Sequence, residues 1–181
     1  MNVFKELKKP IVLFTNFWDA NALINTDGLL IKIDNQIHPI NLSDQNKNNF
    51  SVYSIALSHP SFEKLPNVQK AFKGRLDFFC PVYNLLQRYK QDNNWDKYVE
   101  DYKNLMRERR SQSVKWINSL DINHIYILCC WENTSGKSHC HRDILYTAML
   151  NSKLTKEKIY PIYRSGSPLS ESKIINQLPL D

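Results

Sequence analysis

The stretch His124–Trp131, H-I-Y-I-L-C-C-W, gives the clearest strand signal in the chain. It is almost continuously apolar, which is typical of a strand buried on both faces in a parallel sheet. A polar loop, Glu132–His139, follows it, and Arg142–Leu150 then carries apolar residues at helical spacing. The order of strand, loop and helix predicts one βα unit of a layered fold.

Further strands are predicted on both sides of this unit. Ser51–Leu57 is rich in strand-forming residues, Ile11–Thr15 is a short apolar run, and Lys158–Arg164 is expected to add an edge strand. The polar and aromatic residues Asn16–Asp19 follow Ile11–Thr15 and predict a loop. The predicted strands of the sheet are thus separated from one another by long stretches of the chain.

A hairpin is predicted within residues 25–49. Leu29–Ile33 and Gln36–Ile40 are two strand-like runs. Asp34 and Asn35 join them, and both residue types tolerate the left-handed backbone that a tight turn requires.

The middle of the chain predicts helices. Apolar residues of Val82–Tyr89 are spaced three and four apart, and Asn94 is a suitable cap for a helix that starts at Trp95. Strands that alternate with helices predict an α/β fold, with a layered, mostly parallel sheet flanked by helices, Rossmann-like or flavodoxin-like. We expect residues 1–164 to form a single domain and residues 165–181 to form a loosely attached tail.

The composition limits the classes of protein that fit. The chain has 181 residues, a hydrophobic fraction of 42% and a net charge of +6. No apolar run approaches the roughly 20 residues of a membrane helix, and Ile11–Phe14 is too short for a secretory signal. We therefore expect no membrane association, a cytoplasmic location, and an anionic small molecule or a nucleic acid as partner. A solvated, lysine-rich surface is the alternative explanation of the charge.

Reactive residue types are concentrated after the buried strand. Cys130 and Glu132 lie two residues apart, so their side chains share one face of the strand. Cys140, His141 and Arg142 enter the next helix, where free backbone N–H groups and the helix dipole lower the pKa of a nearby thiol. Because ligands of open α/β sheets bind at the carboxyl ends of the strands, we expect the functional site here.

One interpretation of this segment is an enzyme site. Cys140 is then a nucleophile or redox thiol, and Glu132 and His141 assist it as acid or base. Arg142 is expected to clamp an anion, with Cys130 in the same binding site. With four glycines in the chain there is no usual glycine-rich phosphate loop, and we expect no cofactor.

Two other interpretations stay open. Cys130, Cys140 and one of His139 or His141 could bind a metal, although the spacing C-x9-C-H fits no common zinc pattern. Alternatively, both cysteines are inert and His141 and Arg142 lie on the surface, since cysteine is among the most buried residue types.

The loop after the first strand is expected to contribute to the same site. Thr15 ends that strand, Phe17 and Trp18 follow it, and all three are candidates for substrate binding. Trp18 could stack on a base, and a hydrophobic plug is the alternative role for this side chain.

The order of hydrophobic strand, C-x-E, short loop, C-H-R and apolar helix resembles a widespread microbial family, the domain of unknown function 488. The matching residues are Cys130-x-Glu132 and Cys140-His141-Arg142. The resemblance implies a compact α/β fold with these residues in one pocket, and it implies no particular reaction. Weaker similarity extends over roughly residues 11–150 and includes Leu13–Phe17, Ser54–Ala56 and Tyr83–Tyr102.

Two features depart from the family pattern. Leu57 stands where the family often carries an arginine after its S-I-A-like strand, so one arm of an anion site is lost or replaced. Residues 25–49 resemble an insertion, because the family usually passes quickly from the first strand to the second. The inserted hairpin could be a lid, a partner surface or decoration.

These observations predict a cysteine-dependent enzyme that acts on a nucleotide or a nucleic-acid base. One alternative is a protein that binds or sequesters such a ligand without chemistry, and another is a metal-dependent hydrolase. The reactivity of the Cys140 thiol and the metal content of the protein distinguish the three.

Overall fold

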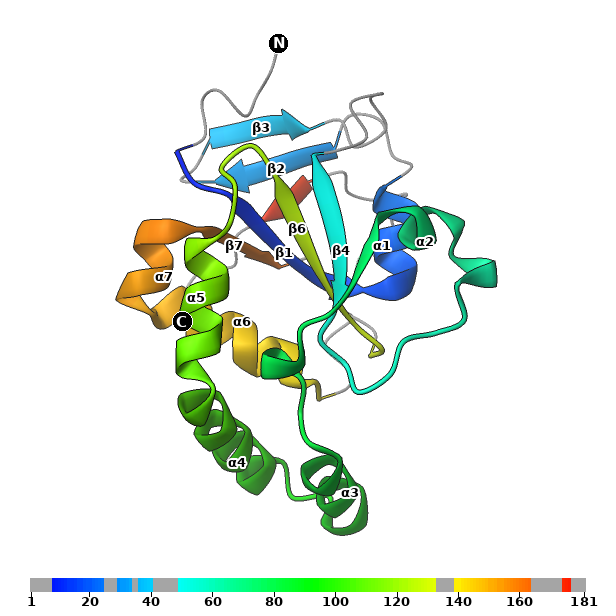
Figure 1. Cartoon of the computed structure of the whole chain (residues 1–181), viewed down its shortest axis with the longest axis vertical. Coiled ribbons are helices and arrows are strands. Elements are labelled where there is room, and N and C mark those ends of the chain that lie inside the picture. The colour runs from blue at the N-terminus through cyan, green and yellow to red at the C-terminus, as the bar shows by residue number, and fades with distance from the viewer. Residues whose placement is uncertain are drawn as a thin grey trace.

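A computed structural model describes residues 8–24, 29–33, 36–40, 49–132, 139–163 and 174–176. Its main sheet has five parallel strands in the order β5-β4-β6-β1-β7 (Figure 1). These strands are β1 (Ile11–Asn16), β4 (Phe50–Ser54), β5 (Phe72–Arg75), β6 (Ile125–Cys130) and β7 (Tyr160–Tyr163).

The apolar stretch that predicted the fold forms the centre of this sheet. All six residues of β6 are buried, and β6 lies between β4 and β1. The layered α/β class is therefore confirmed. The strand order differs from those of the Rossmann and flavodoxin folds. In both of those folds the first two strands are neighbours, whereas here β6 separates β1 from β4.

Helices cover both faces of the sheet. Apolar residues of α1 and α2 share one core with the sheet, and α3, α4, α5 and α6 pack into a second core on the opposite face. Among the described residues, no helix is both long enough and apolar enough to cross a membrane. The helices are α1 (Phe17–Leu23), α2 (Pro66–Ala71), α3 (Tyr83–Asp92), α4 (Trp95–Glu108), α5 (Arg110–Asn118), α6 (His141–Asn151) and α7 (Lys153–Lys158), with short 3₁₀ turns at Phe62–Lys64 and Asp77–Phe79.

The segment after β1 is a helix and not the predicted loop. The Asn16 side chain accepts a hydrogen bond from the Asp19 backbone N–H at 2.8 Å. Asn16 is therefore both the last residue of β1 and the N-cap of α1. Asparagine is a favoured cap, and an acidic residue in the first turn suits the helix dipole. The predicted cap of α4 is confirmed, because Asn94 accepts from the Lys97 N–H at 3.1 Å.

The helices that follow β1 and β6 lie on opposite faces of the sheet. The carboxyl ends of these neighbouring strands therefore form a switch point, the place where open α/β sheets bind ligands. In the register, Asn16 pairs with Cys130 at this edge.

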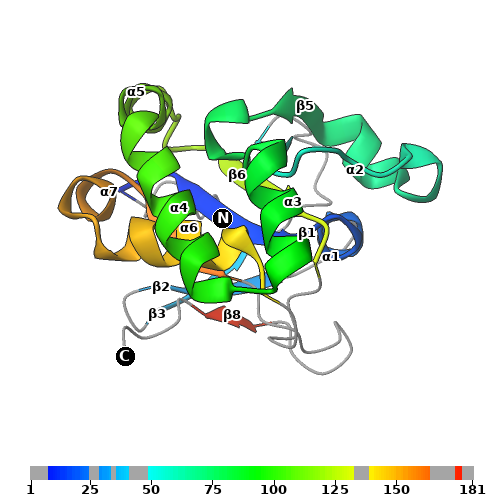
Figure 2. The ribbon, with the colours of Figure 1, turned by 90° about the horizontal axis from the view of Figure 1, so that it is seen from below.

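The segments outside the main domain core form a second sheet. The predicted hairpin strands are β2 (Leu29–Ile33) and β3 (Gln36–Ile40), which pair antiparallel, while the turn between them lies outside the described residues. Strand β8 (Ile174–Asn176), in the segment expected to be a tail, pairs parallel with β2. The three strands lie side by side in Figure 2. The domain boundary at residue 164 stays a prediction.

Candidate functional site

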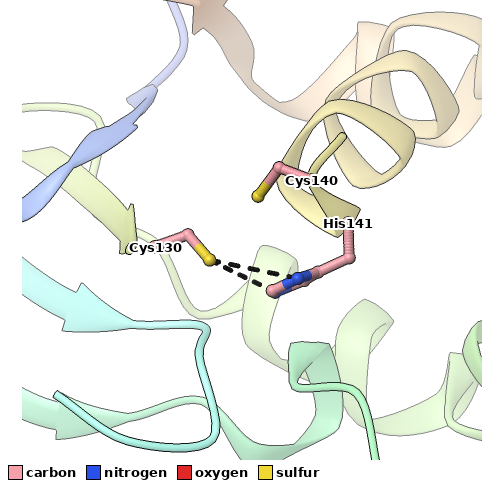
Figure 3. Close-up of side chains that lie close together, drawn as sticks. All are labelled: Cys130, Cys140 and His141. Atoms are coloured by element: carbon pink, nitrogen blue, oxygen red, sulfur yellow. Dashed lines mark hydrogen bonds between the residues drawn. The ribbon is translucent and has the colours of Figure 1, made fainter. Parts of the chain in front are cut away.

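Two sulfur atoms and an imidazole meet where β6 ends and α6 begins. Cys130 is the last residue of β6, Cys140 caps α6, and His141 is its first residue. The ligand atoms of the three side chains all lie within 4.8 Å of one another (Figure 3). The side chains are almost completely buried, with 1%, 2% and 6% exposed. The structure thus brings together the residues that the sequence selected.

Glu132 joins the cluster through a single oxygen atom. Its Oε2 accepts hydrogen bonds from the Cys130 thiol at 2.9 Å and the Cys140 thiol at 3.2 Å. Burial favours the neutral acid, but these hydrogen bonds and the nearby His141 lower the pKa of the carboxyl below its usual value. Because Glu132 is only partly buried, it is the member of the cluster with the most contact with solvent.

His141 is held in one orientation. Its Nε2 lies 2.7 Å from the Ile55 carbonyl oxygen. Since a carbonyl oxygen only accepts, Nε2 carries the hydrogen, and in the neutral ring Nδ1 is the nitrogen with a lone pair. Burial opposes protonation of the ring, but its interactions with Cys140, above all a hydrogen bond, outweigh burial and raise the pKa of His141. The Cys130 sulfur lies 3.9 Å from each ring nitrogen.

The thiol of Cys140 differs from the expectation. We expected the helix N-terminus to lower its pKa, and the Arg142 backbone N–H does donate to the Cys140 sulfur, at 3.4 Å. The hydrogen bond with Cys130 and burial instead raise the pKa of Cys140 well above its ordinary value. Both effects favour the protonated thiol over the thiolate, so a base or a metal that takes the proton would make this sulfur more reactive.

Arg142 does not present its guanidinium to solvent as the predicted anion clamp would. It is fully buried, and its NH1 group donates to the Glu132 carbonyl at 2.9 Å and to the Thr15 carbonyl at 3.2 Å. Its Nε donates to the Tyr163 hydroxyl at 3.1 Å and lies 3.5 Å from the Asp143 Oδ1. Arg142 therefore ties the ends of β1 and β6 to α6 and positions the cluster.

A row of aromatic rings on α4 supports the same helix start. Trp95 stacks on His139 at 4.4 Å and on Tyr98 at 5.2 Å between ring centroids. Tyr98 is stacked with Tyr102, whose ring lies 5.4 Å from His141. The two histidines that flank Cys140 thus both contact this row. The spacing of these rings along the sequence gives no sign of their contact with the site.

The candidate residues after β1 divide between core and surface. Thr15 and Phe17 are fully buried, and within the described part of the chain the Thr15 Oγ1 has no hydrogen-bond partner. Trp18 is 48% exposed, and its ring lies 5.6 Å from that of Trp131, which is 39% exposed. The Trp131 Nε1 donates to the Ser58 carbonyl at 2.9 Å. Trp131 was missed as a site residue, although its place between Cys130 and Glu132 could have identified it.

An arginine from another strand reaches the loop where the family pattern lacked one. Arg75, the last residue of β5, donates from NH1 to the Leu57 carbonyl at 2.6 Å. Its side chain stays 43% exposed and also pairs with Asp77 at 2.5 Å. The loop after β4 therefore contacts His141 through Ile55 and Arg75 through Leu57. Arg75 is thus a partly exposed cation bound to the same loop that contacts His141.

The arrangement combines groups that move protons with groups that bind soft metals. Two thiols donate to one carboxylate, and an imidazole nitrogen faces the same small volume. Such a set supports acid–base or thiol chemistry, and its sulfur and nitrogen atoms are also the ligands that zinc prefers. The partly exposed rings of Trp18 and Trp131 contact each other after the ends of β1 and β6, where a planar ligand could stack.

Comparison with known proteins identifies one family. Residues 38–154 match a family model described as the active DUF488-N3 subclade, where DUF488 is the domain of unknown function 488. Searches of curated proteins and of solved structures gave no match. The resemblance of Leu13–Phe17 lies outside the matched range and stays a prediction. Since the match spans more than half of the chain and includes the whole Cys130–Arg142 segment, this chain belongs to the DUF488 family.

Proposed function

We propose that the chain is a cysteine-dependent enzyme that acts on a nucleotide or on a base in nucleic acid. The observation that carries the proposal is the contact of one Glu132 oxygen with the thiols of Cys130 and Cys140, beside the ring of His141. A cluster of titratable groups at a switch point is where catalysis is expected in an α/β sheet. The description of the matched family model as active agrees with this proposal.

The proposal gives each member of the cluster a role. The two sulfur atoms supply the reactive centre, and Glu132 is the acid or base, because a thiol proton moves to it along an existing hydrogen bond. His141 assists as the second titratable group, with its tautomer set by Ile55. Arg142 is a positioning residue, since its contacts are to buried protein groups.

The substrate class is proposed from the rim of the site. The exposed rings of Trp18 and Trp131 offer faces on which a base can stack. Arg75 offers an exposed guanidinium next to the same loop, which suits a phosphate. The net charge of +6 favours an anionic small molecule or nucleic acid as partner.

Replacing Trp18 by alanine is expected to weaken binding of a labelled oligodeoxythymidine roughly tenfold, since a stacked base contributes about 1–3 kcal/mol. Fluorescence anisotropy titrations measure the change. Trp116→Phe is the matched control, because the Trp116 ring packs against Tyr53 and Phe79 away from the rim. Equal affinities of the wild type and Trp18→Ala would remove Trp18 from the substrate site.

Turnover tests the proposed function directly. The full chain is incubated with the ribonucleoside and deoxyribonucleoside monophosphates and with a mixed-sequence single-stranded oligonucleotide, and products are followed by liquid chromatography and mass spectrometry. We expect one compound to change mass with time, and Cys140→Ser to abolish the change while Cys80→Ala, altered at a buried thiol elsewhere in the core, keeps it. Binding without conversion would contradict the enzyme and favour a protein that sequesters its ligand.

A cytoplasmic location is part of the proposal. All four cysteines are free thiols, and a reducing compartment keeps thiols in this state. A cysteine-dependent reaction requires the same condition, because oxidation of the Cys130 or Cys140 sulfur removes the reactive thiol.

A further inference from the structure

We propose that Cys130, Cys140 and His141 bind one zinc ion, or a divalent ion of the same soft class, with an open fourth position beside Glu132. The inference rests on the site of the proposed function and deepens it, because the cysteines then act in the reaction as metal ligands. The three residues come from two elements, the end of β6 and the start of α6 (Figure 3).

The donor atoms select the class of ion. Thiolate sulfur and imidazole nitrogen are the ligands of zinc and related ions, whereas magnesium and calcium require oxygen. Three protein ligands with one open position are typical of catalytic zinc sites, and two cysteines with one histidine are one known set. The exposed fractions of 1%, 2% and 6% leave these three side chains little contact with bulk solvent.

The spacing of the atoms suits a tetrahedral ion. Ligand atoms that lie at zinc–sulfur and zinc–nitrogen distances from a common centre are roughly 3.5–3.8 Å apart. The Cys130 sulfur lies 3.9 Å from each ring nitrogen of His141, and all three ligand atoms lie within 4.8 Å of one another. Shifts of up to about 1.3 Å, together with a turn of the His141 ring that points Nδ1 toward the sulfur atoms, bring them around one ion.

The surroundings resemble the outer shell of a metal site. A ligating histidine usually donates its other ring N–H to a carbonyl or a carboxylate. Here His141 Nε2 donates to the Ile55 carbonyl at 2.7 Å, so Nδ1 is the nitrogen left for the ion. The Arg142 backbone N–H points to the Cys140 sulfur at 3.4 Å and suits a thiolate ligand.

Charge and protons balance when the ion binds. The thiols of Cys130 and Cys140 each release one proton, so two S–H bonds are exchanged for two metal–sulfur bonds and two thiolates neutralise the divalent ion. Glu132 accepts from both thiols and provides the path by which these protons leave for solvent. Glu132 then lies beside the open position, where it can serve a bound water as acid or base.

The distance of the ligands along the chain explains why no zinc pattern was recognised. Common patterns hold each pair of ligands within a few residues, and C-x9-C-H does not. Here the sheet supplies the proximity, since β6 ends at Cys130 and α6 starts at His141 on the same face.

Zinc binding by the full chain tests the proposal. The protein is purified without chelator for metal analysis, then stripped and titrated with Zn²⁺ against a chromophoric chelator. We expect one ion per chain and at least about 100-fold weaker binding by Cys140→Ser and His141→Ala, since even second-shell changes weaken metal affinity 10–100-fold. Cys129→Ala is the matched control, because Cys129 precedes Cys130 but packs in the core on the opposite face.

A spectroscopic measurement keeps the test decisive if a variant fails to fold. Co²⁺ added to the stripped wild-type chain is expected to show cobalt–thiolate charge-transfer absorption and the visible bands of a tetrahedral ion. Absence of these bands, or less than one Zn²⁺ per folded wild-type chain, would overturn the metal site. Full affinity in Cys140→Ser would overturn it as well.

The two proposals fail in different ways. Turnover by the stripped protein in the presence of chelator would contradict the proposed role of the ion in the reaction and leave the cysteine-dependent enzyme standing. One bound zinc ion without turnover of any compound in the panel would leave the metal site standing and contradict the proposed function.

Discussion

Replacing Arg142 by methionine is expected to lower the free energy of unfolding by about 3 kcal/mol, because a buried acceptor that loses its donor costs about 1–3 kcal/mol. The Arg142 side chain is fully buried. It donates to the Thr15 and Glu132 carbonyls. Methionine fills much of the same space but donates no hydrogen bond, so both acceptors lose this donor.

Urea denaturation and thermal melting measure this effect. For a chain of this size, about 3 kcal/mol corresponds to a melting temperature lower by roughly 6–12 °C. Arg88→Met is the control, since the ion pair of Arg88 with Asp101 is solvent-exposed and contributes at most about 1 kcal/mol. A melting temperature of Arg142→Met equal to that of the wild type would show that Arg142 does not hold the strand ends together.

The parts of the fold that were predicted have strong local signals. The apolar run around β6 needs no knowledge of its neighbours, because burial on both faces leaves no polar position in the strand. The start of α4 was equally clear, since Asn94 is followed by an amphipathic pattern. In both cases one short segment of sequence is enough to predict the element.

The parts that were missed depend on distant segments. Strand β5 is short, alternates between partly buried and exposed residues, and contains Gly74, so neither its length nor its composition predicts a strand. The order of the strands follows from pairing between residues far apart, such as Ile11 with Ile125. Strand β8 likewise forms only by pairing with β2.

The same distinction separates the site residues. Cys130 and Glu132 share a face because side chains alternate along a strand, which the sequence alone reveals. That Arg142 is buried could not be predicted, because its acceptors include the Thr15 carbonyl of another strand. Arg75 reaches the Leu57 carbonyl only through the pairing of β5 with β4.

The contacts of Arg142 connect the stability of the fold with the geometry of the site. Glu132 receives thiol hydrogen bonds on its side chain and the Arg142 guanidinium on its carbonyl. The backbone that carries the carboxylate is therefore fixed by the same residue that joins β1 to α6. A rigid position of this kind is what a proton-transferring group requires.

Replacing Glu132 by glutamine is expected to reduce turnover by about 100-fold or more, the usual contribution of a general acid or base. The amide has nearly the same shape, and its oxygen can still accept from the Cys130 and Cys140 thiols, but it takes up no proton. Because the proposed ion is held by Cys130, Cys140 and His141, this variant should still bind one zinc ion per chain.

Initial rates, metal analysis and thermal melting of the same preparation separate the roles of Glu132. Glu157→Gln, at an exposed position of α7, is the control for loss of one carboxylate and should match the wild type in all three. A rate equal to that of the wild type would exclude Glu132 as the acid or base. Loss of zinc together with activity would instead make Glu132 the fourth ligand, and the open position on which the proposed chemistry depends would be closed.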